Sequence, residues 1–190
     1  LINLIVGFFV GLSSGATVII AQYFGARDEN NVSRTVHTAM AMAIAMGLFL
    51  TVFGLIFSPA LLRLMDTPED VMDHAITYIR IYFIGMIPSL VYNVGSGILR
   101  AIGDSKRPLY FLIIACLTNI VLDVLFVVGF RMNVAGAAWA TILSQAVSAV
   151  LVVIVLMRSR ESYRLVPRQL RFHGDLLRQI IRIGLPAGLQ

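Results

Sequence analysis

The amino-acid sequence predicts an all-α membrane protein, a polytopic bundle of transmembrane helices. Of its 190 residues, 58% are hydrophobic and 13% are charged, whereas soluble domains average about 45–50% apolar and about 25% charged residues. The apolar residues also form long blocks, and a helix needs roughly 20 such residues to cross a bilayer. A chain of this composition has too few polar residues to cover a water-soluble globule.

Each long apolar block is predicted to form one transmembrane helix. The blocks cover residues 1–24, 36–62, 75–99, 109–130 and 135–157. A further block begins near Ile180 and runs to Gln190, so residues 180–190 are expected to start another helix. Because several spans follow the first block, that block is not a cleaved signal peptide.

The positively charged residues predict how the spans are oriented. Connections 25–35, 100–108 and 158–179 hold most of the Lys and Arg, whereas the connections between them contain Arg63 and Arg131. Short connections rich in Lys and Arg remain in the cytoplasm, so these three are predicted to be cytoplasmic and the first residue, Leu1, to lie outside. Since the chain also begins without Met, we expect a fragment of a longer protein with an odd number of earlier spans.

The charge and the reactive residues exclude several classes of function. The net charge of +5 arises from predicted inner connections that can lie against anionic lipid, so no nucleic-acid partner is expected. The single cysteine, Cys116, allows no disulfide within the chain. The three histidines lie in or beside connections without metal-ligand spacing, and no nucleophile elbow or phosphate loop occurs. We therefore predict no enzyme activity and no cofactor.

Several residues predict how the helices pack, bend and end. Gly7, Gly11 and Gly15 form a stripe of small residues that favours close approach of another helix. Pro88 is expected to bend its helix or free backbone groups. Asp175 is a candidate N-cap for the helix that follows the basic connection. Arg80, near the outer end of its span, is expected to snorkel toward water.

Asp123 gives the strongest functional signal, because it interrupts an apolar block and intramembrane acids are costly. Asn119 lies four residues earlier and therefore on the same face of the helix. A connection of about four residues makes the fourth and fifth blocks antiparallel neighbours. Counted from that turn, Asp123 is expected at the depth of Thr141, and Asn119 at the depth of Gln145.

The fifth block carries a matching polar stripe, in which Thr141, Ser144, Gln145 and Ser148 follow helical spacing. Burying both stripes against each other predicts a wet cavity or an ion site. The alternative is an acid that only fixes helix packing. Asn93 and Met46 could extend a substrate cavity, since Met-rich surfaces accept varied apolar shapes, although Met also fills ordinary gaps.

Three stretches resemble the multidrug and toxin extrusion (MATE) family of transporters. "GLSSGATVIIAQYFGARDENNVSR" resembles its second helix and inner loop. "YIRIYFIGMIPSLVYNVGSGILRAIGDSKRP" resembles its fourth helix with an Arg-Ala-x-Gly-Asp-x-Lys-x-Pro tail, the most specific motif. "IRIGLPAGLQ" resembles the start of the seventh.

The resemblance implies most of the amino-terminal six-helix lobe of a transporter. Residues 1–157 would form its helices two to six, 158–179 the cytoplasmic linker between lobes, and 180–190 the first helix of the second lobe. Asn119, Asp123 and Thr141 match family positions that bind the coupling Na+ or H+, with a fourth ligand in a first helix. The implied protein is a monomer in the cell (plasma or inner) membrane.

The resemblance also implies antiport of cationic amphipathic drugs or toxins by alternating access, with no cofactor besides the coupling ion. The expected substrate cavity includes Gln145, Asn93, Ser148 and Met46. The nearest alternative is a flippase for lipid-linked saccharides, which needs several cationic residues in its cavity to hold a pyrophosphate. A membrane-embedded enzyme lacks a catalytic set here, and a scaffold would leave the two polar stripes unexplained.

Overall fold

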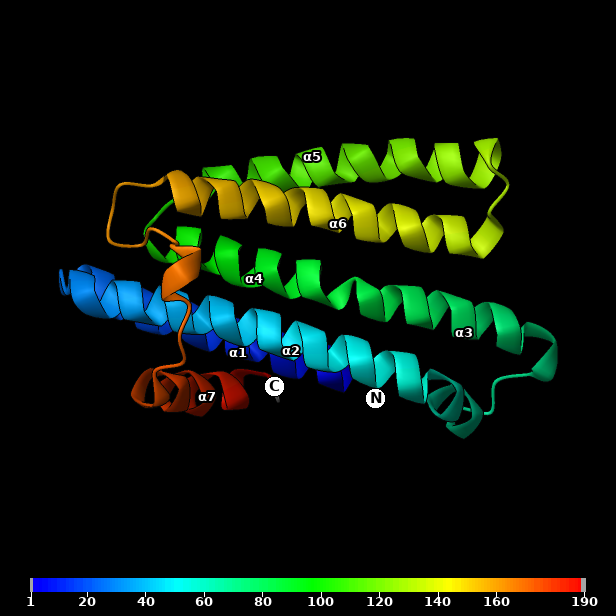
Figure 1. The fold of residues 1–190 in the computed structure, drawn as a ribbon, viewed down its shortest axis with the longest axis horizontal. Helices are drawn as coiled ribbons and strands as arrows, with labels where there is room; N and C mark the ends of the chain where they lie inside the picture. The colour runs from blue at the N-terminus through cyan, green and yellow to red at the C-terminus, as the bar shows by residue number, and fades with distance from the viewer. Residues whose placement is uncertain (1, 189–190) are drawn as a thin grey trace.

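The computed structural model describes residues 2–188, with side chains placed for residue 7 and residues 11–187, and every regular element in this range is a helix (Figure 1). The α-helices are α1 (Ile2–Gly25), α2 (Glu29–Leu64), α3 (Glu69–Ile84), α4 (Met86–Ala101), α5 (Lys106–Asp123), α6 (Asn133–Arg158) and α7 (Gly174–Gly188). A π-helix, η1 (Val124–Gly129), continues α5, and a short 3-10 helix, η2 (Pro167–Gln169), precedes α7. Leu1 and the last two residues of the predicted sixth block, 189–190, lie outside the described range.

The predicted all-α membrane fold is confirmed. Within the described residues, four stretches are long and apolar enough to cross a bilayer. They are Glu29–Leu64, Glu69–Ala101, Lys106–Gly129 and Asn133–Arg158. The remaining predicted span, 1–24, coincides with α1, a helix of 24 residues.

Several helices extend farther than their apolar blocks. Helix α2 begins at Glu29 and covers most of the predicted connection 25–35. Its start is fixed by Asp28, whose side chain accepts a hydrogen bond from the Asn31 N–H (3.1 Å), a cap that composition does not reveal. At 36 residues and ~1.5 Å per residue, α2 projects well beyond a hydrocarbon core of about 30 Å.

The third predicted span is broken into α3 and α4 at Gly85. Pro88, predicted to bend this helix, explains the position of the break: it has no N–H to donate to the carbonyl of Ile84, four residues earlier. Backbone bonding resumes where Ser89 N–H donates to the Gly85 carbonyl (3.1 Å). The family-specific tail that follows forms the turn into α5, with Gly103 at φ +90° and Asp104 accepting from the Arg107 N–H (3.2 Å).

Helices α1, α2 and α4 contact one another, and α7 packs along α1. The glycine stripe serves this last contact. A Cβ on Gly15 would lie 2.6 Å from the Ile180 carbonyl oxygen, and one on Gly184 would lie 2.7 Å from the Gly11 carbonyl oxygen. Two helices whose backbones approach this closely leave no room for side chains between them. We call α1, α2, α4 and α7, with the segment 159–173, the inner group.

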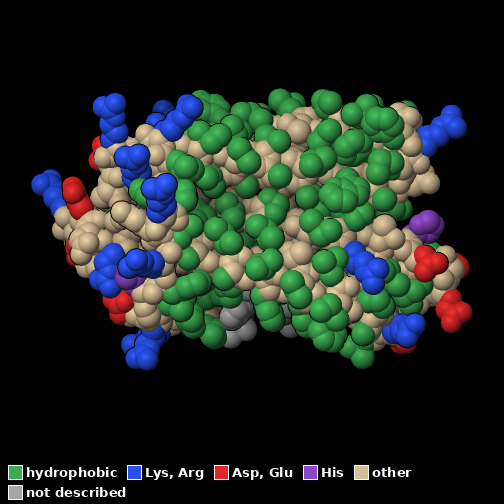
Figure 2. Space-filling model, viewed as in Figure 1, with side chains coloured by type: hydrophobic (Ala, Val, Ile, Leu, Met, Phe, Trp, Pro, Cys, Tyr) green, Lys and Arg blue, Asp and Glu red, His purple; other side chains and the backbone are tan. Residues whose placement is uncertain are grey.

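Helix α5 lies at the edge of the bundle and packs mainly on α6, while α6 also contacts α3 and α4 (Figure 1). The predicted antiparallel pairing of these two blocks is therefore confirmed. We call α5, η1 and α6 the outer pair. Lys and Arg side chains gather at the end of the molecule where the connections α1–α2, α4–α5 and α6–α7 meet, and the middle of the visible face is largely hydrophobic (Figure 2).

The basic connection after α6 is shorter than predicted, because α7 begins at Gly174 rather than near Ile180. The N-cap prediction for Asp175 is wrong by two residues. The Leu177 N–H donates to the carbonyl of His173 (2.8 Å), so His173 holds the cap position and Asp175 lies in the first turn. Its carboxylate forms an ion pair with Arg34 of α2 (3.3 Å).

Candidate functional site

Asn119 connects the polar stripes of α5 and α6. With its amide oriented so that both ends meet complementary groups, Nδ2 donates to Asp123 Oδ2 (3.3 Å) and Oδ1 accepts from the Thr141 N–H (3.3 Å). The structure thus places the three predicted ion-site residues next to one another. The Thr141 hydroxyl itself donates to the Ala137 carbonyl (3.0 Å), so α6 meets Asn119 through its backbone.

Only one of the two carboxylate oxygens of Asp123 has a hydrogen-bond partner among the described residues. Its Oδ2 accepts from Asn119, whereas Oδ1 is shielded from solvent and has no hydrogen-bond partner among the described residues. An unpaired buried acceptor costs about 1–3 kcal/mol, and more when it is charged. A proton or a small cation bound at Oδ1 would remove that cost, so this oxygen is the natural position for a positively charged ligand.

The helix changes its winding directly after Asp123. Residues Val124–Gly129 form a π-helix, and the Phe130 N–H donates to the carbonyl of Leu125, five residues back (2.9 Å). Such π segments interrupt α-helices frequently at functional sites. Here the π-helix directly beyond Asp123 contacts α6, as α5 does.

A cavity of about 320 Å³ opens beside Asn119, between α4, α5 and α6. Its polar lining comes from α6 and α4. The α6 residues are Thr141, Ser144, Gln145 and Ser148, and the α4 residues are Ser89, Tyr92 and Asn93. Of the side chains predicted for a substrate cavity, Gln145, Asn93 and Ser148 therefore share one space. Met46 does not reach it and packs instead against the hydrophobic core.

Three polar groups of the lining already use a proton within their own helices. Ser144 donates to the Thr141 carbonyl (2.7 Å) and Ser148 to the Gln145 carbonyl (2.8 Å). Asn93 Nδ2 donates to the Ser89 carbonyl (2.9 Å). The oxygens of these groups keep lone pairs for a ligand, and such acceptors favour cations and hydrogen-bond donors.

Sequence reasoning missed Ser89 and Tyr92 as lining residues. The sequence did contain a sign of them, because Ser89, Tyr92 and Asn93 follow the spacing of one helix face. The apolar wall from α5, formed by Leu112, Ala115 and Cys116, has no such signal. Within the described part of the chain, no group of three or more His, Cys, Asp or Glu could hold a metal ion, so any cation at Asp123 would depend on neutral oxygen ligands besides the one carboxylate.

The helices and the buried acid define a multi-pass membrane protein with an ionisable group inside its bundle. The profile of the MatE family matches residues 1–125. The "Probable multidrug resistance protein YoeA" of Bacillus subtilis (strain 168) is 34% identical over 98% of this chain. The chain belongs to the multidrug and toxin extrusion (MATE) family.

Solved structures agree with this assignment. One described as the inward-facing conformation of a multidrug resistance MATE family transporter of the MOP superfamily is 30% identical, covers 99% of this chain and has a TM-score of 0.90. Another, described as the outward-facing conformation of a multidrug resistance MATE family transporter of the MOP superfamily, is also 30% identical, covers 99% of this chain and has a TM-score of 0.89. The chain spans 42% of the YoeA relative and 43% and 42% of these two structures, respectively.

Proposed function

We propose that the protein carrying this chain exports cationic amphipathic compounds across the cell membrane in exchange for Na+ or H+. The observation that carries the proposal is the unpartnered Oδ1 of Asp123, on the side chain that Asn119 holds. A cation bound to this carboxylate removes the cost of its unpaired oxygen. The cation can leave when a change in conformation gives that oxygen another partner or access to water. Asn119 positions the acid, and Thr141 supports Asn119 through its N–H.

The polarity of the cavity supports a cationic substrate. The lining residues placed by the structure include no Lys or Arg, and the polar ones retain acceptors. A flippase for lipid-linked saccharides would have to hold a pyrophosphate, which requires cationic groups. Arg80, the base within a predicted span, is exposed and donates to Ser58 on α2 (3.3 Å), outside this cavity. The flippase alternative is therefore disfavoured.

Alternating access in this proposal is a movement of one lobe against the other. The chain is almost equally similar to the two solved structures described as inward-facing and outward-facing, with TM-scores of 0.90 and 0.89. This likeness to both states supports a lobe that keeps its own fold, with the proposed change mainly in how two lobes meet, as in other transporters with repeated halves. Binding of an ion at Asp123 and of a substrate in the cavity would favour different arrangements.

The experiment compares Asp123→Asn with the wild type in the full-length protein. Both are produced in a drug-sensitive host, and ethidium efflux from membrane vesicles is driven by an imposed Na+ gradient or an imposed H+ gradient. We expect the rate of gradient-driven efflux to be at least about tenfold lower in the variant, since removal of a ligand or its support typically lowers affinity about 10–100-fold. The gradient that drives the wild type identifies the ion.

Asp70→Asn is the matched control. Asp70 lies exposed in the first turn of α3, so the same change in charge there should leave efflux unchanged. Gradient-driven efflux by Asp123→Asn at the wild-type rate would contradict the role of Asp123. Absence of drug efflux in the wild type, with normal amounts of folded protein in the membrane, would contradict the proposed substrate class.

A further inference from the structure

A second polar cavity, of about 370 Å³, lies where the N-terminal part of α2 meets the segment 159–173. We call it the junction pocket; its polar lining includes Asn30, Ser33, Arg34, Arg168, Arg171 and His173. We propose that the junction pocket binds a phosphate group, the phosphodiester of an anionic phospholipid headgroup. This site is separate from the α5–α6 cavity and does not depend on the proposed transport function.

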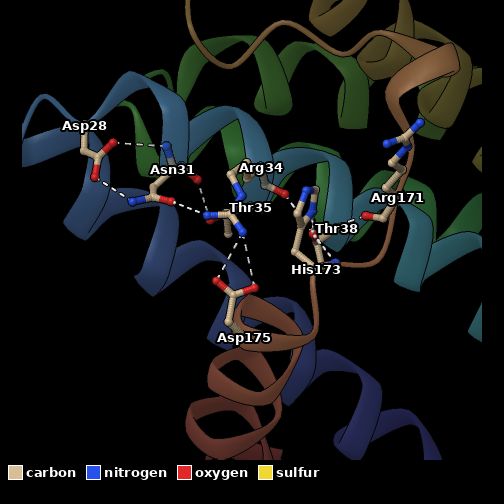
Figure 3. A network of polar contacts seen from close by, with 8 residues as sticks. All are labelled: Asp28, Asn31, Arg34, Thr35, Thr38, Arg171, His173 and Asp175. Atoms are coloured by element: carbon tan, nitrogen blue, oxygen red, sulfur yellow. Dashed lines mark hydrogen bonds and ion pairs between the residues drawn. The ribbon is translucent and has the colours of Figure 1, made fainter.

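The wall of the pocket is fixed by hydrogen bonds that need no ligand. Thr38, fully buried, bonds to the Arg34 carbonyl (2.8 Å) and accepts from the His173 N–H (3.3 Å) (Figure 3). His37 is also buried, and its Nε2 accepts from the Val166 N–H (3.0 Å). Both residues thus tie the backbone of the segment 159–173 to α2. Because the backbone of this site is already ordered, ligand binding costs little conformational entropy.

His37 contributes shape rather than charge. Its Nδ1 lies 2.7 Å from the Ser33 carbonyl oxygen, where only an N–H can form a hydrogen bond. Its Nε2 accepts from the Val166 N–H, so this nitrogen carries no proton. The arrangement assigns the Nδ1–H tautomer to His37, and the arginines are the permanent positive charges of the pocket.

The three arginines differ in how they are engaged. Arg34 pairs with Asp175 (3.3 Å) and donates to Asn31 (3.0 Å) (Figure 3). Arg168 and Arg171 are exposed, and no carboxylate among the described residues lies within 4.0 Å of either guanidinium. Two unneutralised guanidinium groups at one cavity form a strong site for an anion, and their planar forks match phosphate oxygens.

The remaining donors of the pocket suit the same ligand. Asn30 and Ser33 lie in the first turns of α2, where the helix dipole favours negative charge. Asp28 holds Asn31 (2.7 Å) and Asp175 holds Arg34, while the exposed Glu29 lines a different cavity. An incoming phosphate therefore meets donors on both sides without facing an unpaired carboxylate.

The position of the pocket favours lipid as the source of the phosphate. The pocket lies at the end of the bundle where basic connections gather (Figure 2), the end that the positive-inside rule places in the cytoplasm. Basic pockets at that level of a membrane protein contact anionic headgroups. Free phosphate carries the same chemistry, so the test must distinguish the two sources.

The test uses the full-length protein in detergent micelles doped with phosphatidylglycerol, with lipid adducts counted by native mass spectrometry. The double variant Arg168→Gln, Arg171→Gln removes the unpaired charges of the pocket. Its matched control is Arg160→Gln, Arg164→Gln, which removes the same charge from exposed positions of the same segment outside the pocket lining. We expect affinity to fall about tenfold further in the pocket variant than in the control.

Two further arms complete the test. Micelles doped with phosphatidylcholine should give few adducts, which supports recognition of the anionic headgroup. Displacement by millimolar inorganic phosphate that depends on Arg168 and Arg171 would support the phosphate site with soluble phosphate as its ligand. Equal loss in the two double variants, or no loss in the pocket variant, would overturn the proposal, because binding would then be diffuse or located elsewhere. Unchanged thermal unfolding of both variants verifies that they are folded.

Discussion

The inner group and the outer pair satisfy buried polar groups in opposite ways. In the inner group, Thr35, His37 and Thr38 are 0–2% exposed, and each has a hydrogen-bond partner on its own helix or on the segment 159–173. In the outer pair, Asp123 keeps one buried oxygen without a partner. Complete pairing fixes a structure, whereas an unpaired acceptor leaves free energy for a ligand to gain.

Packing follows the same division. Glycines of α1 and α7 bring two backbones into direct contact, while α5 touches mainly α6 and exposes large apolar side chains along much of its length. Leu109, Leu117 and Val121 are each more than half exposed, as expected for a helix that faces lipid or another part of a larger protein. Stability should therefore depend on the inner group, and function on the outer pair.

The largest effect on stability is expected from Gly15→Ala. The added Cβ would lie 2.6 Å from the Ile180 carbonyl oxygen and 2.7 Å from the Gly184 backbone nitrogen, so α1 and α7 must separate. Overpacking of this kind costs about 1–3 kcal/mol, and it should appear as a lower unfolding temperature in detergent, followed by the fluorescence of the single Trp, Trp139.

Gly129→Ala provides the matched substitution in the outer pair. Its Cβ would meet Leu125 at 3.7 Å, an ordinary contact, and Ala is favoured over Gly in helices by about 1 kcal/mol. We expect unchanged or slightly higher stability. If Gly15→Ala were tolerated as well as Gly129→Ala, the close contact of α1 and α7 would not contribute to stability, and the comparison would fail.

A smaller loss is expected from Thr38→Val, which keeps the shape of the side chain and removes its hydroxyl. The N–H of His173 would lose its partner on the buried Thr38, at a cost near the lower end of about 1–3 kcal/mol, because no helix has to move as it must at Gly15. The same change at Thr118 on α5 should be nearly neutral, because that hydroxyl only bonds to the Ile114 carbonyl of its own helix (2.8 Å).

Thermal unfolding of the two Thr variants side by side measures this difference. Limited proteolysis locates it, since release of the segment 159–173 should expose the bonds after Arg168 and Arg171 to trypsin in Thr38→Val. Equal stability of Thr38→Val and Thr118→Val would indicate that the attachment of this segment to α2 contributes nothing.

The features predictable from sequence are those set by periodicity and solvent preference. Apolar blocks gave the spans, and the short turn gave the antiparallel pairing of α5 and α6 that brings Asn119 to the Thr141 N–H. The matching depth of Asp123 and Thr141 stays a prediction. Pro88 could be expected to disturb its helix, because the missing N–H is a local property. Helix ends were predicted less well: α2 begins earlier because of one cap at Asp28, and α7 begins at Gly174.

The parts that escaped prediction depend on contacts between distant segments. The bond from the Val166 N–H to His37 joins residues 129 positions apart, and the meeting of Arg34 with Asp175 spans 141 positions. Periodicity within one helix carries no information on such pairs. Met46 illustrates the converse case: its residue type suggested a substrate surface, but it is partly buried and packs against the core.

The smallest effect is expected from the ion pair of Arg34 and Asp175, which is exposed and screened by salt. Desolvation, the largest single influence, acts to raise the pKa of the Asp175 carboxyl. Hydrogen bonds from the Leu176 and Asp175 N–H groups, with Arg34 and His173, lower it, and the net pKa lies below the ordinary 3.8. The folded protein thus favours the ionised form.

The sign of the pH dependence follows from that shift. A lowered pKa in the folded state adds stability above the unfolded pKa of 3.8, and this contribution disappears as the pH falls through the lower folded value. The difference in unfolding temperature between wild type and Asp175→Asn should therefore be small and constant above about pH 5, and should vanish in stronger acid. A difference that instead grows on acidification would mean that Asp175 acts through packing. A difference that survives in molar salt would mean that it acts through its hydrogen bonds within α7, and the attachment of α7 to α2 would then owe nothing to the ion pair with Arg34.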